Sequence, residues 1–177
     1  AQIWLASGFI QMTHYRTTMA LHRLSERDSL TDTLNRRSLH ARASAVLEKA
    51  QELKVPVTLI MMDADHFKRI NDEHGHDAGD QVLKYISDLF VETLRHTDIV
   101  GRFGGEEFIL LLPDTDRDNA LIVIDRLREK LQASALTVEG KEIRITATFA
   151  VTEVTLEDKT IEDVIRRADK ALYEGKA

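Results

Sequence analysis

The distribution of apolar and polar positions along the chain predicts alternating helices and strands. Two apolar runs, 57–62 and 107–113, are continuous, which is typical of strands buried on both faces. Elsewhere apolar residues recur with the spacing of one helix face, which predicts helices over 36–54, 78–94, 114–133 and 161–176. Shorter strands are expected over 98–103, 135–140 and 141–154. The polar stretch 63–80 has no regular period, so we expect an irregular loop there.

The order of these elements predicts an α+β fold, with helices packed on a mostly antiparallel central sheet. Either Asp32 or Asn35 is expected to cap the first helix. We expect Gly104 and Gly105 to supply positive φ for a tight hairpin turn between two strands.

Residues 1–27 are expected to form a linker or stalk helix, and residues 28–177 a single domain. Apolar residues in the first segment are spaced loosely, as on a helix. We interpret this segment as the end of an upstream membrane helix or as one face of a connecting helix. Either interpretation places a sensor or membrane region before residue 1.

Composition and charge exclude several classes of function. The chain has 177 residues, 43% hydrophobic and 31% charged, which is the composition of a globular domain. A net charge of -6 argues against a nucleic-acid partner and against attraction to anionic lipid. The absence of cysteine excludes a disulfide scaffold and a thiolate zinc site. It fits a reducing compartment, so we expect a cytoplasmic domain, either free or membrane-anchored.

Carboxylates cluster where two predicted strands meet. Asp63 and Asp65 follow the run 57–62, and Glu106 and Glu107 follow the glycine pair. If the two strands are neighbours, these groups converge, and like charges that close repel unless a cation lies among them. Hard oxygen ligands, with the Ala64 carbonyl between the aspartates, favour Mg²⁺ or Mn²⁺. The alternative is a strand-end aspartate and a solvated hairpin tip.

Further polar residues suit a phosphorylated purine. Lys68 and Lys176 are candidates to bind phosphate oxygens. Asn71 and Asp80 are candidates to read guanine, because a carboxylate accepts from its N–H and NH₂ edge and would be left unpaired by adenine. The alternative is that the lysines are solvated and the other two residues cap turns.

Several ordered motifs resemble those of the GGDEF-domain diguanylate cyclases, over about residues 28–176. They are 28-DSLTDTLNRR-37, 63-DADHFKRIND-72, 75-GHDAGD-80, 104-GGEEF-108 and 168-ADKALYEGK-176. Asp32 stands where the family often has glycine, and Gly175 where it usually has alanine. The resemblance implies a palm-like fold related to nucleotidyl cyclases. It also implies an enzyme that condenses two GTP molecules into cyclic di-GMP and two pyrophosphates across a homodimer.

The resemblance also assigns roles to individual residues. Asp63, Glu106 and the Ala64 carbonyl would hold the metal, Glu107 would add a further acid, and either glutamate would help to deprotonate the 3′-hydroxyl. The phosphate-binding groups would be Lys68, Lys176 and the backbone N–H groups of His66 and Phe67. Asn71 and Asp80 would read guanine.

An inhibitory product site is implied by 95-RHTD-98, which matches the family's R-x-x-D pattern. Arg95 and Asp98 would bind cyclic di-GMP, and Arg126 would be lent from a neighbouring domain. The competing hypothesis is a non-catalytic module that binds GTP or cyclic di-GMP without turnover. A further alternative is an output domain that stays inactive until an upstream sensor dimerises it.

Overall fold

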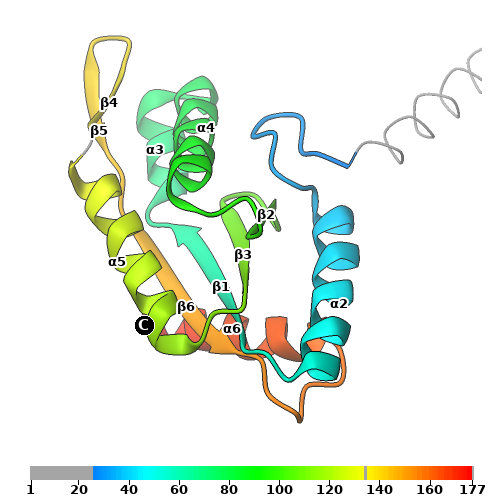
Figure 1. The fold of residues 1–177 in the computed structure, drawn as a ribbon. Coiled ribbons are helices and arrows are strands. Elements are labelled where there is room, and N and C mark those ends of the chain that lie inside the picture. The colour runs from blue at the N-terminus through cyan, green and yellow to red at the C-terminus, as the bar shows by residue number, and fades with distance from the viewer. Residues whose placement is uncertain (1–25, 134, 177) are drawn as a thin grey trace, which may run out of the picture.

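A computed structural model of the chain describes residues 26–133 and 135–176 (Figure 1). Its helices are α2 (Arg36–Leu53), α3 (Phe67–His74), α4 (His76–Thr93), α5 (Arg117–Ala133) and α6 (Ile161–Lys176). Its strands are β1 (Val57–Ala64), β2 (Ile99–Arg102), β3 (Glu107–Pro113), β4 (Ala135–Val138), β5 (Lys141–Arg144) and β6 (Ala147–Glu153). Most predicted elements are therefore present, and the α+β fold is confirmed.

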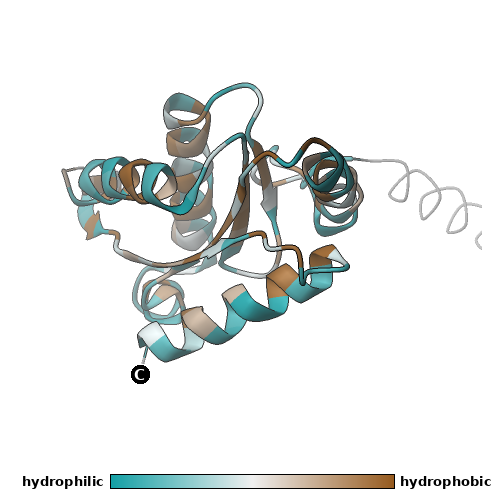
Figure 2. Cartoon of the chain, turned by 60° about the horizontal axis from the view of Figure 1, so that its bottom comes forward, coloured by the Kyte–Doolittle hydropathy of each residue, from teal (hydrophilic) through white to brown (hydrophobic). Residues whose placement is uncertain are grey.

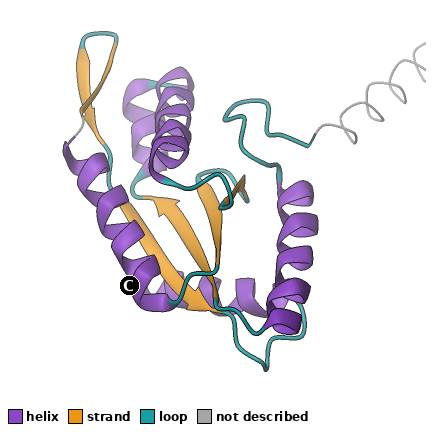
Figure 3. Cartoon of the chain, viewed as in Figure 1, coloured by secondary structure: helices purple, strands orange, loops and turns teal. Residues whose placement is uncertain are grey.

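The central sheet has four strands in the order β2-β3-β1-β6, and every neighbouring pair is antiparallel (Figure 3). β1 is buried along its whole length, as its continuous apolar run predicts. β4 and β5 pair only with each other and form a separate hairpin.

The two faces of the sheet carry separate apolar cores. Side chains alternate along β1, so Ile60 and Met62 pack with α4 and α5, whereas Leu59 and Met61 pack with α2 and α6. Figure 2 shows the apolar strands lying between the helices. An edge-to-face contact between Phe90 and Phe108, with centroids 5.3 Å apart, joins α4 to β3. The sheet is therefore packed on both faces, and polar side chains lie at the ends of its strands.

The prediction of an irregular loop over 63–80 is wrong, because α3 forms within it and α4 begins before Ala78. α3 is only 8 residues long and holds two apolar residues, Phe67 and Ile70, so its helical period rests on a single i,i+3 pair in a polar stretch. Positive φ at His66 (φ 55) and Gly75 (φ 86) marks its two ends.

Two smaller predictions also need correction. The stretch 141–154 is not one strand, since β5 and β6 belong to different sheets. Gly104 and Gly105 do not supply positive φ, because the only positive-φ glycines within residues 26–133 and 135–176 are Gly75 and Gly140.

The structure shows which of the two candidate residues caps α2. Asn35 is the cap, since its side chain accepts from the backbone N–H of Ser38 at 2.9 Å. Asp32 instead occupies a left-handed conformation (φ 53), which aspartate tolerates and glycine adopts without strain. The expected linker helix falls almost wholly outside the described residues. No helix in the described part of the chain is long and apolar enough to cross a bilayer.

Candidate functional site

The carboxyl end of β1 meets the start of β3, and this junction brings the predicted acidic residues together. The antiparallel register sets Asp63 directly opposite Glu107, and the Ala64 N–H donates to the Glu106 carbonyl at 3.3 Å. The expected pairing of the hairpin with the 57–62 strand is thus confirmed. Asp63 is buried at the edge of the apolar core, so its charge is poorly hydrated.

Gly104 makes room for the Glu107 carboxylate. A Cβ built on Gly104 would lie 2.3 Å from Glu107 Oε2, far inside van der Waals contact. The hairpin turn is held by Arg102, whose Nε and Nη2 donate to the Gly105 carbonyl at 3.1 and 2.7 Å. Arg102 also reaches Asp28 of the N-terminal loop, with Nη1 at 3.2 Å from Oδ1. The glycine permits this close approach and does not adopt an unusual backbone conformation.

Negative charge is concentrated at this junction. Burial raises the pKa of Glu107, and the nearby carboxylates of Asp63, Asp169 and Glu106 raise it further, while Lys176 opposes them. The Lys176 ammonium lies 2.5 Å from Asp63 Oδ1 and is the cation seen at the cluster. Our reading of the sequence gave Asp169 no role, although it lies two helical turns before Lys176 on the same face of α6.

The residues at this junction fit a divalent metal by their chemistry. Asp63, Glu106 and the Ala64 carbonyl offer hard oxygen donors, which Mg²⁺ and Mn²⁺ prefer. No three acidic or histidine side chains within the described residues already stand together as a metal-binding group. Instead, Lys176 supplies positive charge to Asp63, and Glu107 holds its proton more tightly than usual. Both observations follow from carboxylates that lie close together at this junction.

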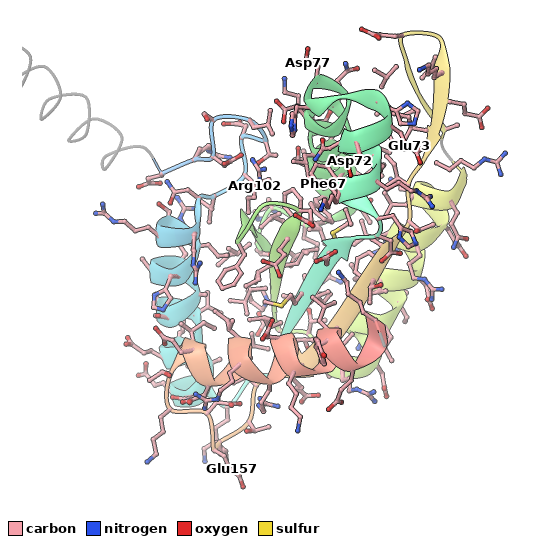
Figure 4. All side chains as sticks on the ribbon, turned by 180° about the vertical axis from the view of Figure 1, so that it is seen from behind. Phe67, Asp72, Glu73, Asp77, Arg102 and Glu157 are labelled. Atoms are coloured by element: carbon pink, nitrogen blue, oxygen red, sulfur yellow. The ribbon has the colours of Figure 1, made fainter. Side chains whose placement is uncertain are left out.

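The turn from β1 into α3 presents the groups predicted to bind phosphate. Asp65 holds this turn, because it accepts from Thr148 Oγ1 at 2.7 Å and its N–H donates to the Thr146 carbonyl at 2.9 Å. His66 and Phe67 follow at the start of α3, where helical N–H groups lack intrahelical partners and favour anions. In Figure 4, Phe67 lies at the end of α3 nearest the sheet. Lys68 is exposed beside them.

The predicted guanine-reading residues lie on two adjoining helices. Asn71 is half-buried on α3, and Asp80 is exposed on the first turns of α4. The two helices pack closely, since the position of Gly79 on α4 lies against the Asn71 side chain.

Arg95, Asp98 and Arg126 line one pocket of about 270 Å³, away from the acidic junction. Asp98 Oδ2 accepts from the Arg95 N–H at 2.8 Å. Burial raises the pKa of Asp98, while Arg95, His96 and Arg126 act in the opposite direction. Arg126 of the same chain also lines this pocket, and the loan of Arg126 from a neighbouring domain stays a prediction.

Comparison with known proteins gives a consistent result. The family profile described as "Diguanylate cyclase, GGDEF domain" matches residues 25–177. A diguanylate cyclase of Vibrio cholerae serotype O1 (strain ATCC 39541 / Classical Ogawa 395 / O395) is 36% identical over 156 residues, which are 88% of this chain and 48% of that protein. The chain spans about half or less of the length of the curated relatives it matches, with 48%, 35% and 34% covered in three of them.

Solved structures agree with this family. The GGDEF domain of DgcB from Caulobacter crescentus, in complex with c-di-GMP, has a TM-score of 0.82 and 27% identity, covering 85% of this chain and 87% of that one. The active GGEEF domain of a diguanylate cyclase from Vibrio cholerae has a TM-score of 0.75 and 35% identity, covering 80% and 90%. The chain therefore belongs to the GGDEF-domain family of diguanylate cyclases.

Proposed function

We propose that this chain is an active diguanylate cyclase that condenses two GTP molecules into cyclic di-GMP and two pyrophosphates. The observation that carries the proposal is the register that sets Asp63 opposite Glu107, with Glu106 beside them. The similar Vibrio cholerae domain, described as active, is also a GGEEF domain.

Asp63, Glu106 and the Ala64 carbonyl are the groups that would hold Mg²⁺ or Mn²⁺. When bound, such an ion offsets the charge of the triphosphate and lowers the pKa of the attacking hydroxyl. Lys176 now pairs with Asp63, and in the loaded site its ammonium is released to bind phosphate oxygens. Lys68 and the N–H groups of His66 and Phe67 bind the same anion from the α3 side.

In each half-reaction the 3′-oxygen of one GTP forms a bond to the α-phosphorus of the other. The bond from that phosphorus to the oxygen bridging to the β-phosphate breaks, and pyrophosphate leaves. The hydroxyl proton passes to the carboxylate of Glu106 or Glu107. Two such steps close the ring.

One chain offers one GTP site, so two chains must meet face to face as a homodimer. Holding two nucleotides in line turns a bimolecular attack into a positioned one, which supplies much of the rate. Asn71 and Asp80 select guanine by pairing with its polar edge. Because GTP is an intracellular substrate, we place the domain in the cytoplasm.

The pocket lined by Arg95, Asp98 and Arg126 is proposed to bind cyclic di-GMP and to inhibit the enzyme. Guanidinium groups bind phosphate or the guanine Hoogsteen edge bidentately, and a carboxylate accepts from guanine N–H groups. The DgcB domain, which is similar in fold, was solved in complex with c-di-GMP.

Incubation with GTP and Mg²⁺, followed by chromatography of the nucleotides, tests the proposal. We expect cyclic di-GMP and pyrophosphate in a ratio of one to two. If calorimetry shows that GTP binds but no cyclic dinucleotide forms at high protein concentration, the non-catalytic binding module is the correct reading.

A further inference from the structure

Gly79 of α4 lies directly against the side chain of Asn71 on α3. A Cβ built on Gly79 would be 2.0 Å from Asn71 Oδ1 and 3.0 Å from its Cγ, with Phe67 Cζ at 3.1 Å. Gly79 itself is buried and lies inside α4, so the helical backbone does not require glycine there. The amide of Asn71 fills the space that a side chain at position 79 would take.

No side chain fits at position 79 while Asn71 keeps its place. Non-bonded heavy atoms reach their best separation at about 3.5 to 4 Å, so a methyl group at 2.0 Å must displace the amide by more than about 1 Å. The Asn71 side chain can move, whereas the backbones of α3 and α4 are fixed by their packing. An added methyl group would therefore turn the amide away from α4.

The next residue along α4 is Asp80, the other candidate for reading guanine. One short segment thus carries the Asp80 carboxylate and also the surface on which the Asn71 amide rests. We propose that Gly79 is a positioning residue for base specificity, which fixes the Asn71 amide relative to the Asp80 carboxylate. This inference rests on the proposed function, because it takes the nucleotide to be GTP.

A double-mutant cycle tests it with Gly79→Ala, Asn71→Ala and both together. Binding of GTP and of ATP is measured by calorimetry, and kcat and KM are measured where turnover occurs. We expect Gly79→Ala to lower kcat/KM for GTP by about tenfold to a hundredfold, since displacements near 1 Å have effects of this size. The preference for GTP over ATP should fall with it. In the Asn71→Ala background Gly79→Ala should have little further effect, because no amide remains to be displaced.

Gly175→Ala is the matched control, since it also adds a methyl group to a helical glycine. Its Cβ would be 3.6 Å from Thr148 Cγ2, an ordinary contact, so GTP affinity should not change. If Gly79→Ala weakens GTP and ATP equally, or keeps its full effect without Asn71, the glycine serves only helix packing and the inference is overturned. Should Gly79→Ala alone fail to fold, the Gly79→Ala/Asn71→Ala variant should recover the melting temperature and bind GTP and ATP as Asn71→Ala alone does, and a failure of either overturns the inference. These binding readouts remain decisive even if the chain makes no cyclic dinucleotide.

Discussion

Replacing Lys176 with methionine tests how the carboxylates at the end of β1 are kept together. In the structure the Lys176 ammonium lies 2.5 Å from Asp63 Oδ1, and its positive charge also opposes the raised pKa of Glu107. Methionine keeps an unbranched apolar stem, one atom shorter than lysine, and removes the charge. The substitution therefore leaves a buried aspartate and two glutamates without the cation that now offsets them.

The size of the effect follows from the exposure of the pair. A hydrogen bond between charged groups contributes about 1.5–3 kcal/mol when it is shielded from water. The Lys176 side chain is 39% exposed and that of Asp63 11%, so solvent screening reduces the expected loss to about 1–2 kcal/mol. For a domain of this size, the melting temperature should fall by about 2–8 °C.

Thermal unfolding with and without Mn²⁺ is the assay, and Lys170→Met is the control. Lys170 is on the same helix, and its partner Glu174 is 3.9 Å away with both side chains exposed, so its loss should cost about 0.5 kcal/mol or less. We expect Mn²⁺ to restore most of the stability of Lys176→Met and to stabilise the parent less, because Lys176 competes with the metal for Asp63. If Lys176→Met unfolds like Lys170→Met, and Mn²⁺ stabilises both equally, this account of the charge cluster is wrong.

Three other substitutions give further predictions. Arg102→Met removes the hydrogen bonds to Gly105 and Asp28, so it should lower the free energy of unfolding, measured by chemical denaturation, by about 1–3 kcal/mol. The control Arg144→Met changes an exposed arginine and should cost little. Equal losses in the two variants would contradict the role of Arg102. Glu107→Gln should abolish turnover. Because the Glu107 pKa is raised in the folded state, the parent should lose stability relative to this variant as the pH rises from 4.5 through that pKa, and a pH-independent difference in melting temperature would refute the shift. Arg95→Ala should relieve inhibition by added cyclic di-GMP in steady-state assays. An unchanged inhibition constant would show that this pocket does not mediate the inhibition.

Much of the sheet was predictable because the central strands are buried on both faces. The continuous apolar runs that form β1 and β3 are typical of buried strands. The carboxylates next to these runs mark the end of β1 and the start of β3. α3 was missed because a helix of 8 residues with two apolar side chains, Phe67 and Ile70, gives one i,i+3 pair and no repeat to confirm it.

The details that sequence could not give are contacts between distant segments. Nothing in the pattern near Lys176 indicates that it pairs with Asp63, and the motif alone does not show that Gly104 and Gly79 serve close approach. Of the two, only Gly104 was expected to permit unusual φ, together with Gly105 of the same turn, which is the commoner reason for glycine in a turn. Their true role depends on which side chain rests against each one, and this is set by tertiary packing.

The most direct test of the central claim is the nucleotide product formed from GTP and Mg²⁺ at increasing protein concentration. If Asp63, Glu106 and Glu107 form half of a GTP-condensing site, cyclic di-GMP should accumulate, at a rate per chain that rises with concentration as homodimers form. Glu107→Gln should form none under the same conditions. Absence of any cyclic dinucleotide from the parent chain at the highest concentration, with GTP still bound, would contradict the account.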